Sequence, residues 1–368
     1  MRYLRWLLLF IPVAILIEVL HGSAVLLFAA SALAVIPLAG LLGEATEALA
    51  EKIGPRLGGL LNATLGNAAE LIITLFAVQA GLLDLVKASL IGSILGNVLL
   101  VTGFSILVGG LKNGIQKFDR AHVGVDATLS ILAVIALSVP SFFNAAIEPD
   151  TLRVEELSLT TAVAMIVIYA LSIIYTLRSR TPVEAEVGPA VPPSHRGPHW
   201  NTRQALGLLV LATVGIAVMS EFLVSSVEPV TQQLGFSEFF VGIIIIPLIG
   251  NVAEHIVAVE VALKNQMDLS LAVALGSSLQ IALFVAPVLV FISLMLGKPL
   301  TLEFNGFEVL ALTAAAVIAA LVALDGESNW LEGAMLLVVY LIIALAFFFL
   351  PSPIKTEARG LTSLLGML

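Results

Sequence analysis

The chain has 368 residues, of which 59% are hydrophobic and 12% charged, and its mean hydropathy is +1.08. Soluble globular domains are about 45 to 50% apolar and about 25% charged, so this composition excludes a soluble fold and indicates a protein whose solvent is lipid. The absence of cysteine excludes disulfides, thiolate catalysis and cysteine metal sites, and a formal charge of −9 without a basic cluster indicates no nucleic acid partner.

Apolar runs between charged residues, prolines and glycines predict eleven membrane-spanning helices. In chain order they cover residues 6–21, 23–43, 58–82, 86–110, 123–147, 157–177, 204–227, 237–263, 270–297, 306–324 and 330–350. The first run also has the pattern of a signal peptide, but a second apolar run covers the place where cleavage would occur, so we expect it to remain as a helix. Lys and Arg are more frequent on one side of these spans, which favours a cytoplasmic N-terminus and a C-terminus on the opposite side.

The predicted fold class is therefore an all-α polytopic membrane protein made of two halves. A polar linker at residues 178–203 contains five prolines and separates them. Residues 1–22 form an extra N-terminal helix, 23–177 and 204–350 each form five helices, and 351–368 form a C-terminal tail.

An internal repeat relates the two halves. The sequence GNAAELI at 66–72 returns as GNVAEHI at 250–256, and the same shift of 184 residues carries Asp84 to Asp268 and the Gly92–Ser93 pair to Gly276–Ser277. Because five crossings separate equivalent points, the second copy enters the membrane from the opposite face. Inverted repeats of this kind are typical of secondary transporters, which bind their substrate near the midplane between the copies.

Each copy places one glutamate in an otherwise apolar stretch, Glu70 in the first and Glu254 in the second. A carboxylate at membrane depth costs about 2.5 kcal/mol or more, so a single one is a structural residue about as often as a functional one, but a matched pair favours function. Helical spacing puts each glutamate on one face with the glycine and asparagine before it. Carboxylates, amides and the carbonyls of a weakened turn suit Ca²⁺, so we expect these metal ligands: Glu70, Glu254, Asn67, Asn251, Gly66 and Gly250.

A second shared segment reads IGSILGN at 91–97 and LGSSLQI at 275–281. Its polar side chains can line the cavity and steady the glutamates, whereas close packing of helices through small residues is the alternative for the two serines. The residues expected to line the cavity are Ser93, Asn97, Ser277 and Gln280.

His255 follows Glu254 and points about 100° away around the helix, so it is a poor ligand for the same ion. It either couples to protons or is a hydrogen-bonded interior residue. Acidic residues at the ends of two spans either form vestibules that attract cations or are solvated helix ends; they are Glu44, Glu47, Glu221 and Glu228.

The motifs GNAAELI, IGSILGNVLLV, GNVAEHI, GSSLQIALF and LGEATEALA resemble those of the calcium/proton exchanger family within the cation/calcium exchanger superfamily. The resemblance covers nearly the whole chain after residue 22. It implies Ca²⁺ export against H⁺, eleven helices with two inverted five-helix repeats, and Glu70 and Glu254 as the shared cation and proton site. It also implies that the asparagines, serines and Gln280 line the cavity, and that Ca²⁺ is the transported substrate, with no cofactor and no enzymatic activity.

The sodium/calcium branch usually carries Ser/Thr-Pro-Glu where this chain has Asn-Ala-Ala-Glu and Asn-Val-Ala-Glu, a departure that favours protons as counter-ion. A sodium/calcium exchanger is the nearest alternative, and a divalent cation channel is a more distant one. We expect alternating access by movement of the second and seventh spans, in the cell membrane of a prokaryote. Mn²⁺ and Cd²⁺ also accept oxygen ligands and remain alternatives to Ca²⁺ as the transported ion.

Overall fold

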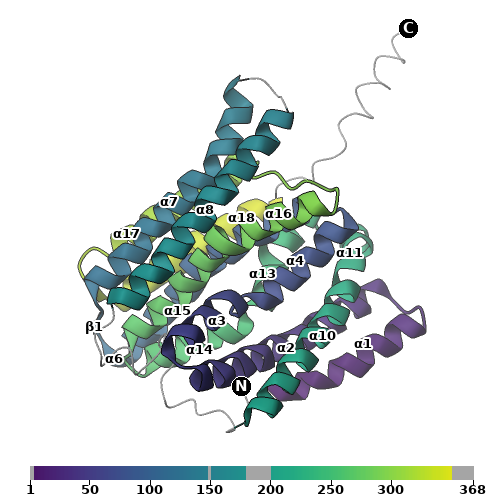
Figure 1. Cartoon of the computed structure of the whole chain (residues 1–368), viewed down its shortest axis with the longest axis horizontal. Helices are drawn as coiled ribbons and strands as arrows, with labels where there is room; N and C mark the ends of the chain where they lie inside the picture. The colour runs from purple at the N-terminus through teal and green to yellow at the C-terminus, as the bar shows by residue number, and fades with distance from the viewer. Residues whose placement is uncertain (1–3, 148–150, 180–199, 350–368) are drawn as a thin grey trace.

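The computed structural model describes residues 4–147, 151–179 and 200–349. Over these residues the chain is a bundle of helices with one small sheet, in which β1 (Gln116–Lys117) pairs antiparallel with β2 (Glu327–Ser328). Figure 1 shows that the bundle has two ends. We call the end with β1, β2 and the α14–α15 and α2–α3 turns the sheet end, and the end with α11 and the α1–α2 and α4–α5 turns the α11 end.

The first half contains the elements from the N-terminus to α8. They are η1 (Leu4–Leu9), α1 (Phe10–Val19), α2 (Ala24–Ile53), α3 (Pro55–Leu65), α4 (Ala68–Ala80), α5 (Leu83–Leu95), η2 (Gly96–Val101), α6 (Thr102–Asn113), β1, α7 (Arg120–Ile147) and α8 (Thr151–Ser179). The second half begins after the linker. Its elements are α10 (Thr202–Ser225), α11 (Val227–Leu234), α12 (Glu238–Phe240), η4 (Val241–Ile245), α13 (Ile246–Gly250), α14 (Val252–Leu263), α15 (Met267–Gln280), η5 (Ile281–Val285), α16 (Ala286–Met295), α17 (Gly306–Val322), β2 and α18 (Trp330–Phe349).

Length and apolar composition make this a multi-pass membrane protein. Among the described residues, seven helices are long and apolar enough to cross a bilayer, or nine if each of two bent helix pairs counts as one span. Large apolar side chains stay exposed on the outer helices, as at Leu211 (69%) and Phe349 (76%), where lipid rather than water would cover them. The eleven predicted spans also include η1 with α1 and the 17-residue α17, which fall below that length criterion.

The two predicted weak points are breaks in the helices. Gly66 and Asn67 separate α3 from α4, and Asn251 separates α13 from α14. Three further segments, η2, η4 and η5, are π-helical, a geometry that is frequent near functional sites. Both halves therefore interrupt regular helix in the same region of the bundle, and the starts of α4 and α14, like those of α5 and α15, are 184 residues apart.

Several predicted boundaries differ from the structure. The second span was expected to end at residue 43, but α2 continues to Ile53, because the acidic stretch after it is a good helix former despite its charge. The linker predicted at 178–203 is shorter than expected, since α8 reaches Ser179 and α10 starts at Thr202. The rest of the linker, residues 180–199, and the predicted tail at 351–368 lie outside the described residues.

Candidate cation site

The two glutamates lie in the first turns of α4 and α14, directly after the two helix breaks. A helix N-terminus carries partial positive charge, so each broken helix presents a favourable end to its own carboxylate. Glu70 is buried, Glu254 is partly exposed, and the two are near enough for their charges to interact. A Cβ added to Gly250 would lie 2.9 Å from Oε1 of Glu70, so this carboxylate rests against the break of the other half. The structure therefore brings the two predicted ligands together.

Three buried oxygen atoms in this region lack a hydrogen-bond partner. They are Oε1 of Glu70, Oε2 of Glu254 and Oδ1 of Asn251. Buried polar atoms in proteins are nearly always paired, so unpaired acceptors on two carboxylates and an amide fit a cation that is held by oxygen. Among the described residues, no three His, Cys, Asp or Glu side chains gather as a metal site. Any further ligands would have to be amides, hydroxyls, carbonyls or water.

Ser277 connects side chains from both halves. Its Oγ accepts a hydrogen bond from Nδ2 of Asn97 and donates one to Oδ1 of Asn67, each at 3.0 Å. Nδ2 of Asn67 in turn donates to Oε1 of Gln280 at 2.8 Å. Glu254 lies within reach of the same serine hydroxyl, which has only one proton to donate. The hydroxyl can therefore support either the Asn67 amide or the Glu254 carboxylate at a given moment.

The two predicted asparagines are held differently. Nδ2 of Asn251 donates to the Pro247 carbonyl at 3.0 Å and to Oγ of Ser93 at 3.3 Å, which leaves its Oδ1 free. Asn67 uses both ends of its amide. The geometry favours Asn251 over Asn67 as a direct ligand in this conformation. The missing side chain of Gly66 lets the Gln280 side chain approach the α3–α4 break, because a Cβ on Gly66 would lie 3.0 Å from Oε1 of Gln280.

Replacing Ser277 by alanine tests this network. Asn97 would lose its acceptor and Asn67 its donor, and a buried polar group without a partner costs about 1 to 3 kcal/mol. We expect Ser277→Ala to lower the Tm of the protein in detergent and to weaken Ca²⁺ binding. Ser278→Ala is the matched control, since the Ser278 hydroxyl bonds only to the Leu275 carbonyl of its own helix at 2.8 Å. Equal Tm values for the two variants would contradict the network.

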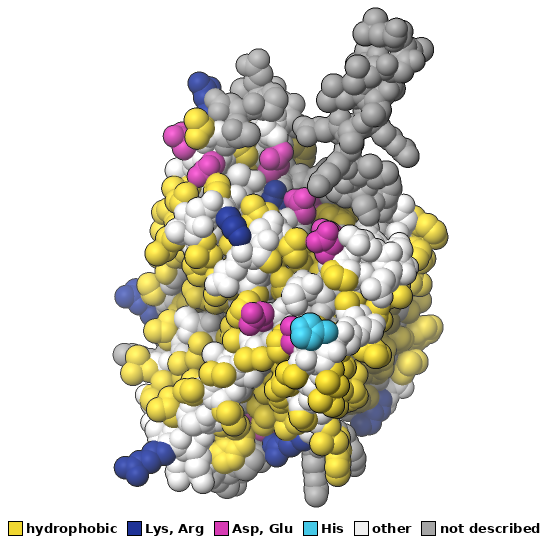
Figure 2. All heavy atoms as spheres, turned by 90° about the vertical axis from the view of Figure 1, so that its right-hand side faces the viewer, with side chains coloured by type: hydrophobic (Ala, Val, Ile, Leu, Met, Phe, Trp, Pro, Cys, Tyr) yellow, Lys and Arg dark blue, Asp and Glu magenta, His cyan; other side chains and the backbone are white. Residues whose placement is uncertain are grey.

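None of the three unpaired oxygens belongs to His255 or to the four predicted vestibule residues. The His255 imidazole has a buried Nε2 without a partner, so its predicted role in proton coupling stays a proposal. Glu44 forms an ion pair with Arg5 at 2.9 Å, and Glu47 is partly buried on the same helix near the sheet end. Glu221 and Glu228 are exposed near the α11 end. Figure 2 looks onto that end and shows acidic side chains spread among hydrophobic ones.

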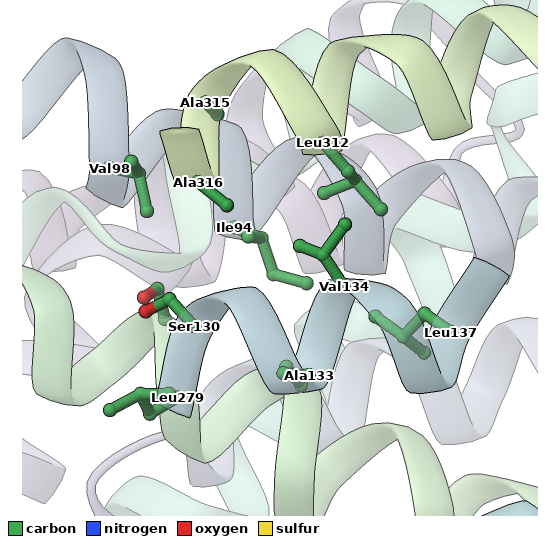
Figure 3. Close-up of a pocket in the computed structure, with 12 residues that line it drawn as sticks. Ile94, Val98, Ser130, Ala133, Val134, Leu137, Leu279, Leu312, Ala315 and Ala316 are labelled. Carbon is green, nitrogen blue, oxygen red and sulfur yellow. The ribbon is translucent and has the colours of Figure 1, made fainter. Parts of the chain in front are cut away.

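A small apolar cavity lies between α5, η2, α7, α15, η5 and α17, and Figure 3 shows its lining. It contains two hydroxyl groups, and each donates to a carbonyl of its own helix, Ser130 to Asp126 and Ser278 to Leu275. The other lining residues are aliphatic: Ile94, Val98, Ala133, Val134, Leu137, Leu279, Ala282, Leu312, Ala315 and Ala316. No charged group lines the cavity, so it is unsuited to hold a cation.

Polar residues that fix the ends of the two glutamate helices were not predicted. At the sheet end, Nε2 of the buried Gln116 donates to the Ala262 carbonyl at the end of α14 at 3.0 Å, and Asn113 donates to the same carbonyl at 3.2 Å. At the α11 end, Nζ of Lys298 donates to the Gln79 carbonyl at the end of α4. In the sequence these residues look like ordinary turn residues, and no pattern links them to helices of the other half.

A family model described as "Sodium/calcium exchanger protein" matches residues 23–178 and again residues 204–349. A "Ca(2+)/H(+) antiporter" from Aphanothece halophytica is 44% identical over 359 residues, which cover 94% of this chain and 96% of the relative. "Ca(2+)/H(+) antiporter ChaA" from Bacillus subtilis is 40% identical over 341 residues, with 92% and 97% covered. The crystal structure of the Ca²⁺/H⁺ antiporter YfkE superposes with a TM-score of 0.82 at 38% identity, over 95% of this chain and all of that one.

Proposed function

The chain belongs to the sodium/calcium exchanger protein family, and we propose that it exchanges Ca²⁺ for H⁺ through one site shared by Glu70 and Glu254. The protein is a Ca²⁺/H⁺ antiporter and not an enzyme, with Ca²⁺ as its transported substrate. The observation that carries the shared site is the group of unpaired buried oxygens on Glu70, Glu254 and Asn251. Ca²⁺ prefers six to eight oxygen ligands, and water and backbone carbonyls would complete the set.

The coupling follows from the cost of burying two negative charges. A bare pair of carboxylates in a low-dielectric interior repel each other and lack solvation, so this state would not cross between the two sides. One Ca²⁺ neutralises the pair, and so does a proton on each carboxylate. Because both ions use the same oxygens, they cannot occupy the site together. The site can therefore change sides only when it holds Ca²⁺ or protons, and the transport cycle exchanges Ca²⁺ for H⁺.

Within this function we propose an inverted-repeat layout with eleven crossings. Support comes from the family model, which matches each half separately, and from the 184-residue offset between the starts of α4 and α14 and of α5 and α15. Counting η1 with α1 and α17 as spans adds two crossings to the nine helices and helix pairs that meet the length criterion. We further propose a cytoplasmic N-terminus in a prokaryotic cell membrane, so that the sheet end faces the cytoplasm.

The counter-ion can be tested with purified protein in sealed vesicles. A proton gradient is expected to drive ⁴⁵Ca²⁺ uptake, and a sodium gradient of equal size at constant pH is expected to drive none. Raising the proton concentration on the side where Ca²⁺ binds should lower its apparent affinity, because both ions compete for the two carboxylates. Uptake that follows the sodium gradient and ignores the proton gradient would identify a sodium/calcium exchanger. Flux that does not saturate and needs no counter-ion would identify a channel.

A further inference from the structure

Two matched helix faces beside the cation site differ in burial. On α5, the residues that face η4 are all buried, with Leu85 at 2% and Ala88 at 0% exposure. The residues 184 positions later form the same face of α15, and none of them is fully buried although their neighbours on the other face are. The α5 face is Leu85, Ala88, Ser89 and Gly92, and the α15 face is Leu269, Ala272, Val273 and Gly276.

Each face contains one glycine, and the space beside that glycine shows whether another helix packs on the face. A Cβ added to Gly92 would lie 1.9 Å from the carbonyl oxygen of Ile243, so α5 and η4 touch through their backbones. A Cβ added to Gly276 would meet nothing within 4 Å. The two glycines are equivalent in sequence, yet one is a tight helix contact and the other is open.

The partner that α15 lacks lies in α3, at the positions equivalent to η4 and α13. The pair Gly242 and Gly58 makes this clear. A Cβ on Gly242 would lie 2.8 Å from Cβ of Ala88 on α5, whereas a Cβ on Gly58 would lie 2.4 Å from the Ala50 carbonyl oxygen on α2. Segment 241–250 therefore rests on α5, and α3 rests on α2 instead of on α15.

Burial along the two segments agrees with this difference. Val241 is fully buried, and its counterpart Leu57 on α3 is 61% exposed. On the α11 side of the site, segment 241–250 packs against α5. The equivalent contact at the sheet end, between α3 and α15, is absent. The described conformation therefore lacks, at the sheet end, the helix contact that covers the α11 side of the site.

We propose that α3 has a second position, docked on the α15 face, and that Gly276 is the contact on which it closes the sheet end of the site. This inference rests on the proposed exchange function, because alternating access requires each end to close in turn. Gly59 on α3 is the residue equivalent to Ile243. In the docked position its carbonyl oxygen would approach Gly276 as the Ile243 carbonyl oxygen approaches Gly92. Only glycine leaves room for that approach, so Gly276 is a positioning residue that is needed for transport and not for Ca²⁺ binding.

Gly276→Ala separates these two roles. In the described conformation the added methyl group meets nothing, and alanine favours helix, so the fold and Ca²⁺ binding in detergent are expected to stay unchanged. In the docked conformation the same methyl group would collide with backbone, so proton-driven exchange is expected to fall at least about tenfold. Gly124→Ala is the control, since Gly124 also has nothing within 4 Å and lies on α7, outside α3 and α15.

A cysteine label reports the position of α3 directly. The chain has no cysteine, so Leu57→Cys gives a single reactive thiol. While the carrier exchanges ions, we expect this thiol to react with a maleimide more slowly than it does in the protein at rest, and we expect Gly276→Ala to remove the slowing. Wild-type exchange in Gly276→Ala, or loss of Ca²⁺ binding together with exchange, would overturn the proposal. If the unsubstituted protein itself binds no Ca²⁺, the failure lies in the proposed function instead.

Discussion

Glu70→Gln and Glu254→Gln are each expected to abolish proton-driven ⁴⁵Ca²⁺ uptake in vesicles. Glutamine keeps the size of the side chain but removes the negative charge, so a single remaining carboxylate would have to balance a divalent cation in a buried site. The unpaired oxygens Oε1 of Glu70 and Oε2 of Glu254 are the acceptors that each change alters. Glutamine also cannot take up and release a proton, so both halves of the exchange cycle are lost.

A matched control for these variants is Glu156→Gln. Glu156 is exposed on α8, so it shares the chemistry but not the burial. We expect its uptake to stay near that of the unsubstituted protein. Exchange that persists in either Glu70→Gln or Glu254→Gln, at normal protein levels, would refute the shared site.

Gly250→Ala is expected to have the second largest effect on binding. The added methyl group would lie 2.9 Å from Oε1 of Glu70, closer than side-chain carbons approach such atoms, so the carboxylate must move away from the α13–α14 break. A displaced ligand shell typically costs about 10- to 100-fold in metal affinity. Calorimetric titration of Ca²⁺ into the detergent-solubilised variant measures this loss.

Gly124→Ala is a suitable comparison, because Gly124 lies on α7 and an added Cβ would meet nothing within 4 Å. Its Ca²⁺ affinity is expected to equal that of the parent protein. Should Gly250→Ala also bind Ca²⁺ as tightly as the parent, the Glu70 carboxylate would not be a ligand in the position described.

Much of the fold could be predicted because membrane helices leave strong local signals. Long apolar runs predict spans by length alone, and the Gly66–Asn67 and Gly250–Asn251 pairs predict the breaks, since glycine weakens a helix and asparagine competes for backbone hydrogen bonds. The end of α2 was missed for the opposite reason. Residues 44–53 are polar enough to look like the end of a span, but they lack a glycine or proline that would stop the helix before Gly54.

The candidate site could be predicted as a set of residues but not as a set of contacts. The repeat identified the glutamates, asparagines and serines together, yet it treats the two copies as equal. In the structure Asn67 is held at both ends of its amide while Asn251 keeps a free oxygen, and Gly92 is covered while Gly276 is open. In any one conformation of a transporter the two repeats pack differently, because one side of the site is closed and the other is not. The sequence repeat does not indicate which copy is the closed one.

The central claim is that one buried pair of carboxylates must be neutralised by either Ca²⁺ or protons. Measuring the protons released when Ca²⁺ is added to the detergent-solubilised protein in a weakly buffered solution tests it most directly. We predict that Ca²⁺ binding releases protons, that release grows as the starting solution becomes more acidic, and that the Glu70→Gln/Glu254→Gln double variant releases none. Ca²⁺ binding of unchanged affinity at acidic and alkaline pH, with no proton released, would contradict the account.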